Sequence, residues 1–124
     1  MSRKMFFDAF YGQFHDFLDQ LIQVFPEDSD FPAYKTGLTL LQKTNPRIVP
    51  EQVVVHVTPF EKMIRERNET FFLDYIFPDY AGDNALDLVI TKMKGLWETL
   101  SPTSKTVVWD YLTLLVDLAP RCVA

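Results

Sequence analysis

Apolar residues recur every three or four positions along most of the chain, which is the period of an α-helix. The clearest stretch covers residues 3–25, where the apolar side chains share an arc of about 160° and acidic or amide side chains hold the opposite side. A coiled-coil seam is narrower than this arc, so we expect the helix to lie against a globular core. Pro26 ends it, because proline cannot continue helical hydrogen bonding.

The same pattern predicts a second helix that ends near residue 43. The segment Asp28-Ser29-Asp30 offers N-cap side chains, and Pro32 suits a first helical turn. Gly37 lies inside this helix, where it either weakens the helix or marks a close crossing with another helix.

Residues 53–57 are the least certain part of the pattern, because their β-branched side chains are typical of a strand. Pro50 and Pro59 leave little length for a strand, however, and no partner strand is evident. A lone strand would leave its backbone groups without hydrogen bonds, so we favour a short helix that begins at Pro50.

A capping box is predicted after this segment, with Thr58 as the N-cap, Pro59 in the first turn and Glu61 reaching back to the cap. We expect the helix that it begins to end near residue 67. Another short helix is expected within residues 69–77, before the longest loop of the chain.

Two apolar helices close the chain. Asp83 or Asn84 is expected to cap the first, which runs to about residue 99. Ser101 and Pro102 begin the second, which we expect to end near Ala119. With no repeat or linker between segments, the pattern predicts an all-α fold. We expect one compact domain over residues 1–124, a bundle of about five to seven helices with a C-terminal helical hairpin.

The charge distribution argues against nucleic acid and membranes as partners. The chain has 12 Lys and Arg against 17 Asp and Glu, with a net charge of -5 and no concentrated basic footprint. Binding of nucleic acid through a local basic patch is the weaker alternative. No apolar run reaches the length of a membrane span, and Asp8 interrupts any signal-peptide core, so we expect a soluble intracellular protein. The basic patch would comprise Lys62, Arg65, Arg67, Lys92 and Lys94.

No residue pattern points to catalysis, to a metal or to a cofactor. His15 and His56 lack nearby ligands, and Cys122 follows Pro120 in what we expect to be an exposed tail. The paired aspartates occupy helix starts, where they act as caps, and there is no glycine-rich phosphate loop. We therefore expect a protein that is not an enzyme and that holds no cofactor.

The last helix is apolar over about 220° of its circumference, which is more than a peripheral helix needs. It is either central in the bundle or shared between the core and a partner. Under the second interpretation one edge, Trp109 and Val116, or the opposite edge is exposed. Aromatic side chains anchor protein contacts, so we expect the Trp109 edge to bind a protein partner, with a symmetric homodimer as the simplest case. The opposite edge consists of Val107, Leu114 and Leu118.

Residues 68–80 combine many aromatic side chains with several acidic ones. They form either a wall of the core or a surface that presents Phe77 and Tyr80 to the same partner. The function predicted from these patterns is a non-enzymatic protein–protein interaction module that binds through Trp109, Val116, Phe77 and Tyr80. The alternative is a small-molecule-binding protein, or an enzyme, with a pocket lined by phenylalanines.

Several segments within residues 56–119, about half of the chain, carry a family pattern. They are Arg67-Asn68-Glu69-Thr70-Phe71-Phe72-Leu73, Leu96-Trp97-Glu98-Thr99-Leu100-Ser101, Ser104-Lys105, Val108-Trp109-Asp110-Tyr111-Leu112, and Leu114-Leu115 through Ala119. In these segments the chain resembles small helical proteins of nucleocytoplasmic large DNA viruses, the giant viruses of algae and protists. The resemblance implies a viral protein in the cytoplasm of an infected cell or in the virion, and it brings no catalytic residue.

Overall fold

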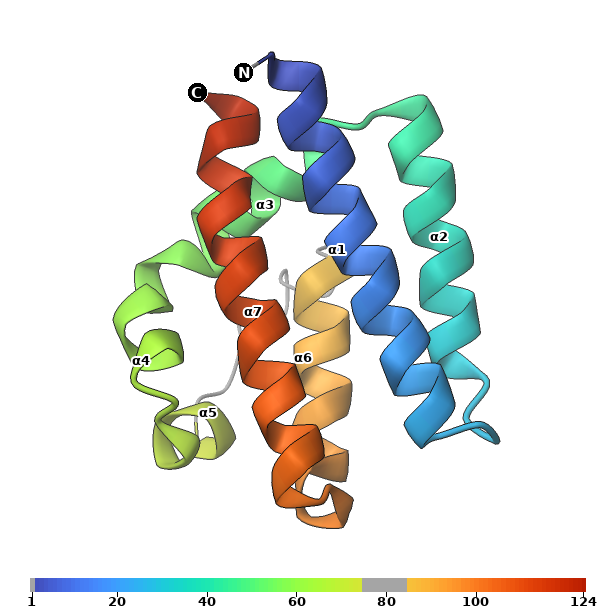
Figure 1. Ribbon diagram of the computed structural model, residues 1–124, viewed down its shortest axis with the longest axis vertical. Coiled ribbons are helices and arrows are strands. Elements are labelled where there is room, and N and C mark those ends of the chain that lie inside the picture. Colours follow the sequence, from blue (N-terminus) through green and yellow to red (C-terminus); the bar gives the residue numbers. More distant parts are fainter. Residues whose placement is uncertain (1, 75–84) are drawn as a thin grey trace.

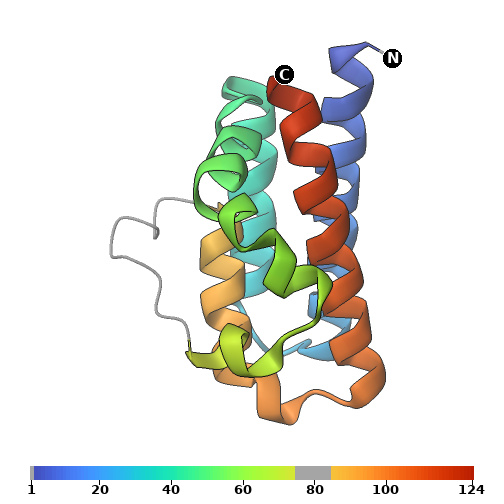
Figure 2. The same cartoon turned by 90° about the vertical axis from the view of Figure 1, so that its left-hand side faces the viewer.

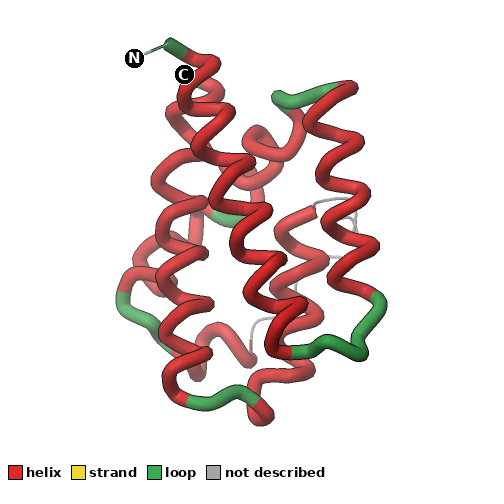
Figure 3. Tube along the Cα trace, turned by 45° about the vertical axis from the view of Figure 1, so that its right-hand side comes forward, coloured by secondary structure: helices red, strands yellow, loops and turns green. Residues whose placement is uncertain are grey.

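The computed structural model describes residues 2–74 and 85–124, and these residues are helical with short connections. The predicted all-α fold is confirmed, since no strand occurs in the described ranges (Figure 3). The helices are α1 (Arg3–Val24), α2 (Asp30–Thr44), α3 (Ile48–His56), α4 (Glu61–Arg65), α5 (Glu69–Asp74), α6 (Ala85–Leu96) and α7 (Pro102–Val123), with 3₁₀ turns at Thr58–Phe60 and Trp97–Thr99 (Figure 1).

The long helices run alongside one another, and each reverses the direction of its neighbour (Figure 1). Helices α3, α4 and α5 cover one side of this group (Figure 2). Helix α7 packs against α1, α3 and α4, whereas α2 packs against α1 and α6. The two chain ends lie close together, and the Arg3 guanidinium donates a hydrogen bond of 2.6 Å to the carbonyl of Ala124.

The core is formed mainly by α1 and α7. Phe10, Phe14 and Phe17 of α1 are fully buried, as the period of the sequence predicts. Trp97, just after α6, meets Trp109 of α7 edge to face, with ring centroids 5.5 Å apart. Helix α7 contributes seven buried residues, Val108, Trp109, Leu112, Leu115, Val116, Ala119 and Cys122.

Helix starts and ends follow the predicted pattern in most places. Ser101 caps α7 by accepting a hydrogen bond of 3.1 Å from the backbone amide of Ser104. Asp28 accepts one of 2.9 Å from the amide of Asp30 at the start of α2. Residues 53–56 are helical, so the interpretation as a helix is confirmed, although α3 begins at Ile48 rather than at Pro50. The predicted cap at Asp83 or Asn84 lies outside the described residues.

The capping box predicted at Thr58 is wrong. The Thr58 hydroxyl instead donates a hydrogen bond of 3.3 Å to the carbonyl of Val53, and α4 begins only at Glu61. The cause is the short connection between two helices, since Thr58 follows α3 directly and satisfies a carbonyl of its last turn.

The exposed tail predicted around Cys122 is also wrong. Helix α7 continues through Pro120 to Val123, and Cys122 is fully buried. One more helical turn brings the thiol into the apolar core. The burial of the thiol offsets the cost of the hydrogen bond that proline cannot make. Burial raises the pKa of the Cys122 thiol to about 11.

Candidate functional site

The expected contact edge of α7 is not exposed. Trp109 retains 5% of its accessible surface and Val116 retains 1%. Three neighbouring helices surround α7, so the wide apolar arc is used inside the bundle, and the interpretation of α7 as a central helix is the one that the burial supports. The prediction that the Trp109 edge faces solvent is therefore wrong. Phe77 and Tyr80 lie outside the described residues.

The opposite side of α7 does reach the surface. We call Val107, Tyr111, Leu114 and Leu118 the α7 edge. Leu114 is 41% exposed, and the other three side chains are half-buried. Their spacing of four, three and four residues places them in one row along the helix. The α7 edge is thus a continuous apolar row that the described residues leave partly uncovered.

Polar side chains of α1 border the α7 edge. Gln13 and Gln20 line a groove of about 330 Å³ together with Tyr111 and Leu114. A second groove of about 180 Å³ continues from Gln20 past Val107 toward the end of α1. The Tyr111 ring stacks on Phe17 with centroids 5.2 Å apart, which holds it in place between the two helices.

Charged side chains on the other flank of the α7 edge are compensated within the chain. Arg67 pairs with Asp110, and Arg65 pairs with both Asp117 and Glu61. The hydrogen bonds that the Arg65 guanidinium donates to Asp117 and Glu61 raise its pKa. This flank therefore carries fixed ion pairs rather than isolated charges.

Four of the five cations in the basic patch considered for nucleic acid pair with carboxylates in the same way. Besides Arg65 and Arg67, Lys62 lies 3.9 Å from a carboxylate oxygen of Glu66. Lys92 lies 2.9 Å from Asp28 and 2.7 Å from Asp30. Cations that already have carboxylate partners gain less from phosphate contacts, which weakens the case for nucleic-acid binding.

The described residues include no group of three His, Cys, Asp or Glu side chains that could hold a metal ion. His15 instead lies within hydrogen-bond distance of the Gln42 side chain, 3.2 Å between Nε2 and Oε1. The Tyr11 hydroxyl donates to the carbonyl of Pro46 at 2.6 Å. These polar groups therefore serve to join helices.

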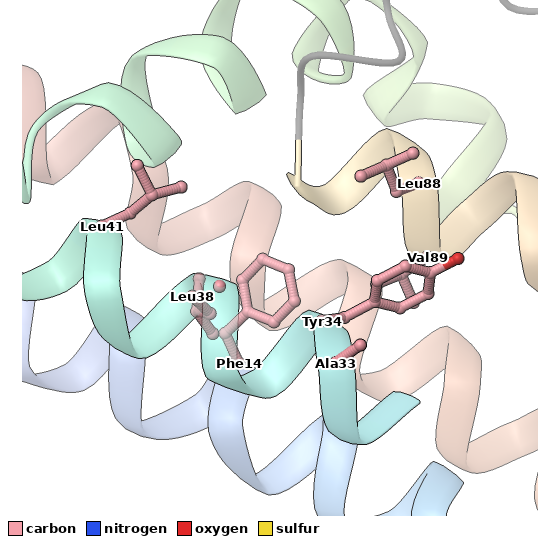
Figure 4. A pocket seen from close by; sticks show the side chains of 8 residues that line it. Phe14, Ala33, Tyr34, Leu38, Leu41, Leu88 and Val89 are labelled. Atoms are coloured by element: carbon pink, nitrogen blue, oxygen red, sulfur yellow. The ribbon is translucent and has the colours of Figure 1, made fainter. Parts of the chain in front are cut away.

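A separate cavity lies where α2 and α6 diverge above α1, and we call it the α2–α6 pocket (Figure 4). Its volume is about 220 Å³. The one sign of this pocket in the sequence was Gly37 in the middle of an amphipathic helix. The lining residues are Phe14, Ala33, Tyr34, Gly37, Leu38, Leu41, Leu88 and Val89.

Comparisons of the chain with protein-family models, curated proteins and solved structures found no match. The resemblance to giant-virus proteins therefore stays a prediction. Within the described ranges, no helix is both long enough and apolar enough to cross a membrane.

Proposed function

We propose that this chain is a non-enzymatic helical module for protein–protein interaction and that its contact surface is the α7 edge. The observation that carries the proposal is the row of apolar side chains with Leu114, 41% exposed, near its centre. Scattered single apolar residues are ordinary on protein surfaces, whereas a continuous row beside grooves is typical of an interface. The proposed setting is the interior of a cell, an infected one if the viral resemblance holds.

A second copy of the chain is the occupant that we favour. The row is symmetric about the midpoint between Tyr111 and Leu114, because Val107 and Leu118 lie equally far from it. Two α7 edges that pair antiparallel about a two-fold axis would set Val107 against Leu118 and Tyr111 against Leu114 of the second copy.

The charges beside the row are compatible with this pairing. The chain carries a net charge of -5, so two copies repel each other overall. Next to the row, however, Asp110 and Asp117 are paired with Arg67 and Arg65. Local compensation of this kind lets like surfaces approach without placing bare carboxylates against each other.

The substitution Leu114→Glu tests the proposal, with Leu40→Glu as the matched control. Leu40 is 61% exposed on α2, away from the row, so both variants replace an exposed leucine by the same charge. Sedimentation equilibrium should show a dimer for the wild type and for Leu40→Glu. It should show a dissociation constant raised about tenfold or more for Leu114→Glu, which corresponds to a loss of about 1.4 kcal/mol or more of binding free energy. Circular dichroism should show all three proteins folded.

A wild type that stays monomeric at every concentration would contradict self-association. The broader proposal then rests on a different protein partner, which is sought by capture from the native cell with the same three proteins as bait. A partner kept by the wild type and by Leu40→Glu but lost by Leu114→Glu supports the α7 edge. Capture that is equal for Leu114→Glu, or absent for all three, rejects it.

The second candidate function, binding of a small molecule, is favoured by the α2–α6 pocket. Phe14 is the only phenylalanine among the described residues that line that pocket, where leucine, valine and tyrosine take the place of the several phenylalanines expected. Tyr34 is the one titratable side chain among its lining residues. Acid–base or nucleophilic catalysis needs several convergent groups, so the pocket favours binding over an enzymatic role.

A further inference from the structure

The α2–α6 pocket lies beside a helix, α2, that packs mainly against α1 and α6 among the described residues. Helix α2 buries only Phe31 and Leu38. On its inner side, Tyr34 extends toward Val89 of α6, and the ring of Phe14 from α1 lies between Leu38 and Tyr34 (Figure 4). Leu88 of α6 borders the pocket and is 39% exposed. The pocket is therefore an apolar recess that is open to solvent on one side.

Two aromatic rings of the pocket are held in place from behind. Phe14 packs edge to face on Phe10, with centroids 6.1 Å apart. Tyr34 packs edge to face on Phe31 at 6.1 Å, and Phe31 in turn stacks on Phe25 at 5.9 Å. Side chains fixed in this way lose little rotamer freedom on binding, so the recess is prepared for a ligand rather than formed by it.

Gly37 keeps the wall of the pocket open. A β-carbon added at this position would meet none of the described atoms within 4 Å, so the close helix crossing considered from the sequence is not what the structure shows. Glycine in a helix interior costs about 0.5–1 kcal/mol relative to alanine. The space beside Gly37 is thus maintained at some cost in stability.

A charged cluster that acts on Tyr34 from outside the lining of the pocket disfavours anions. Lys92 contacts both Asp28 and Asp30, so two carboxylates surround one ammonium group and leave a net negative charge. In Figure 4 the Tyr34 hydroxyl lies beside Val89 of α6. Burial, followed by the charge of Asp30, raises the pKa of Tyr34, so the phenol stays neutral near pH 7 and can donate or accept a hydrogen bond.

We propose that the α2–α6 pocket binds a small uncharged aromatic molecule of the phenol class, with its ring over Phe14 and its polar group toward Tyr34. The volume of about 220 Å³ fits such a molecule, since an apolar protein cavity of about 150 Å³ binds benzene. Aromatic rings also favour edge-to-face contacts with the rings already in place. This site is distinct from the α7 edge, and the proposal rests on the second candidate function, for which it names the ligand class.

The test uses 4-methylphenol as the probe and Gly37→Leu as the blocking variant. Gly12→Leu is the matched control, because Gly12 lies in the middle of α1, lines none of the described pockets and has no described atom within 4 Å of an added β-carbon. Saturation-transfer NMR and calorimetry should show equal binding by the wild type and by Gly12→Leu. Gly37→Leu should bind at least about tenfold more weakly.

Two further probes check the ligand class. Benzoate should bind at least about tenfold more weakly than 4-methylphenol, because the net negative charge of Asp28, Asp30 and Lys92 acts on the Tyr34 side of the pocket and repels a carboxylate. Hexan-1-ol should also bind more weakly, because it offers no ring. If either probe binds as well as 4-methylphenol, the assigned ligand class is wrong.

Two results overturn the site itself. One is the absence of 4-methylphenol binding by the wild type at millimolar concentration, and the other is equal binding by a folded Gly37→Leu variant. If Gly37→Leu fails to fold, Ala33→Leu narrows the same pocket from one turn away and takes its place. Sedimentation of the blocking variant should match that of the wild type, so a failure of this site is distinguishable from a failure of the α7 edge.

Discussion

Helices α7 and α2 are both amphipathic, yet they use their apolar residues in different ways. Helix α7 buries seven residues in contact with α1, α3 and α4. Helix α2 buries two and contacts α1 and α6. The wide apolar arc of α7 is therefore used in packing against three helices. The narrower apolar face of α2 is only partly covered by α1 and α6. Candidate binding surfaces lie where neighbours are missing, not where the sequence is most apolar.

The largest expected effect compares two equally buried leucines, Leu112 on α7 and Leu38 on α2, each 1% exposed. Leu112→Ala should destabilise the fold by about 4 kcal/mol, because close packing on all sides leaves a cavity. Leu38→Ala should cost about 2 kcal/mol, because one side of Leu38 already borders the α2–α6 pocket. Chemical denaturation of both variants measures the difference, and equal losses would remove the distinction between the two helices.

An intermediate effect concerns the end of α7. Because Cys122 is buried, iodoacetamide at pH 8 should modify the folded protein far more slowly than the unfolded chain.

The raised pKa of the Cys122 thiol also has a consequence for stability. The unfolded chain loses the thiol proton near pH 9.0 and the folded protein only near 11, so stability should fall as the pH rises through this window.

The variant Cys122→Ala isolates this dependence. Tyr11 is also buried, and its pKa is raised mainly by burial and further by the charge of Cys122, so its loss of stability at high pH has the same sign. The difference between wild type and Cys122→Ala, measured by denaturation at several pH values, therefore belongs to the thiol together with its electrostatic coupling to Tyr11. Rapid alkylation of the folded protein would mean that the last turn of α7 is open.

The smallest effect is a gain in stability on α2. Gly37→Ala should stabilise the protein by about 0.5–1 kcal/mol, because alanine favours the helix and its β-carbon meets no described atom within 4 Å. Gly12→Ala, in an equally open position on α1, should raise the free energy of unfolding by a similar amount. The melting temperatures of both variants measure the gain. A loss for Gly37→Ala alone would show that the space beside α2 is more crowded than the described residues indicate.

Most of the fold was predictable because helix signals are local. The period of the apolar residues, Pro26 after α1 and the cap at Ser101 identified the main helices. Even residues 53–56 were assigned correctly, by the absence of a partner strand. The error at Pro120 arose because tertiary packing outweighed a local helix breaker, and the stabilisation that carries α7 to Val123 comes from distant residues.

The candidate site was harder to predict than the fold. The sequence showed that α7 has more apolar surface than one neighbour needs, and it named both edges of the helix. It could not show that Trp109 and Val116 would be covered while Leu114 stayed exposed. The number of helices around each face is a property of the packed bundle, since burial depends on contacts between residues far apart in the chain.

Local sequence thus determined the helical class, the extent of most helices and the excess of apolar surface on α7, because hydrogen bonding and side-chain periodicity within one helix depend on near neighbours. Only the tertiary structure decided which edge of α7 reaches solvent, that Cys122 lies in the core and that a pocket opens beside Gly37. These features arise from the angles and spacings at which helices meet, which no single segment encodes.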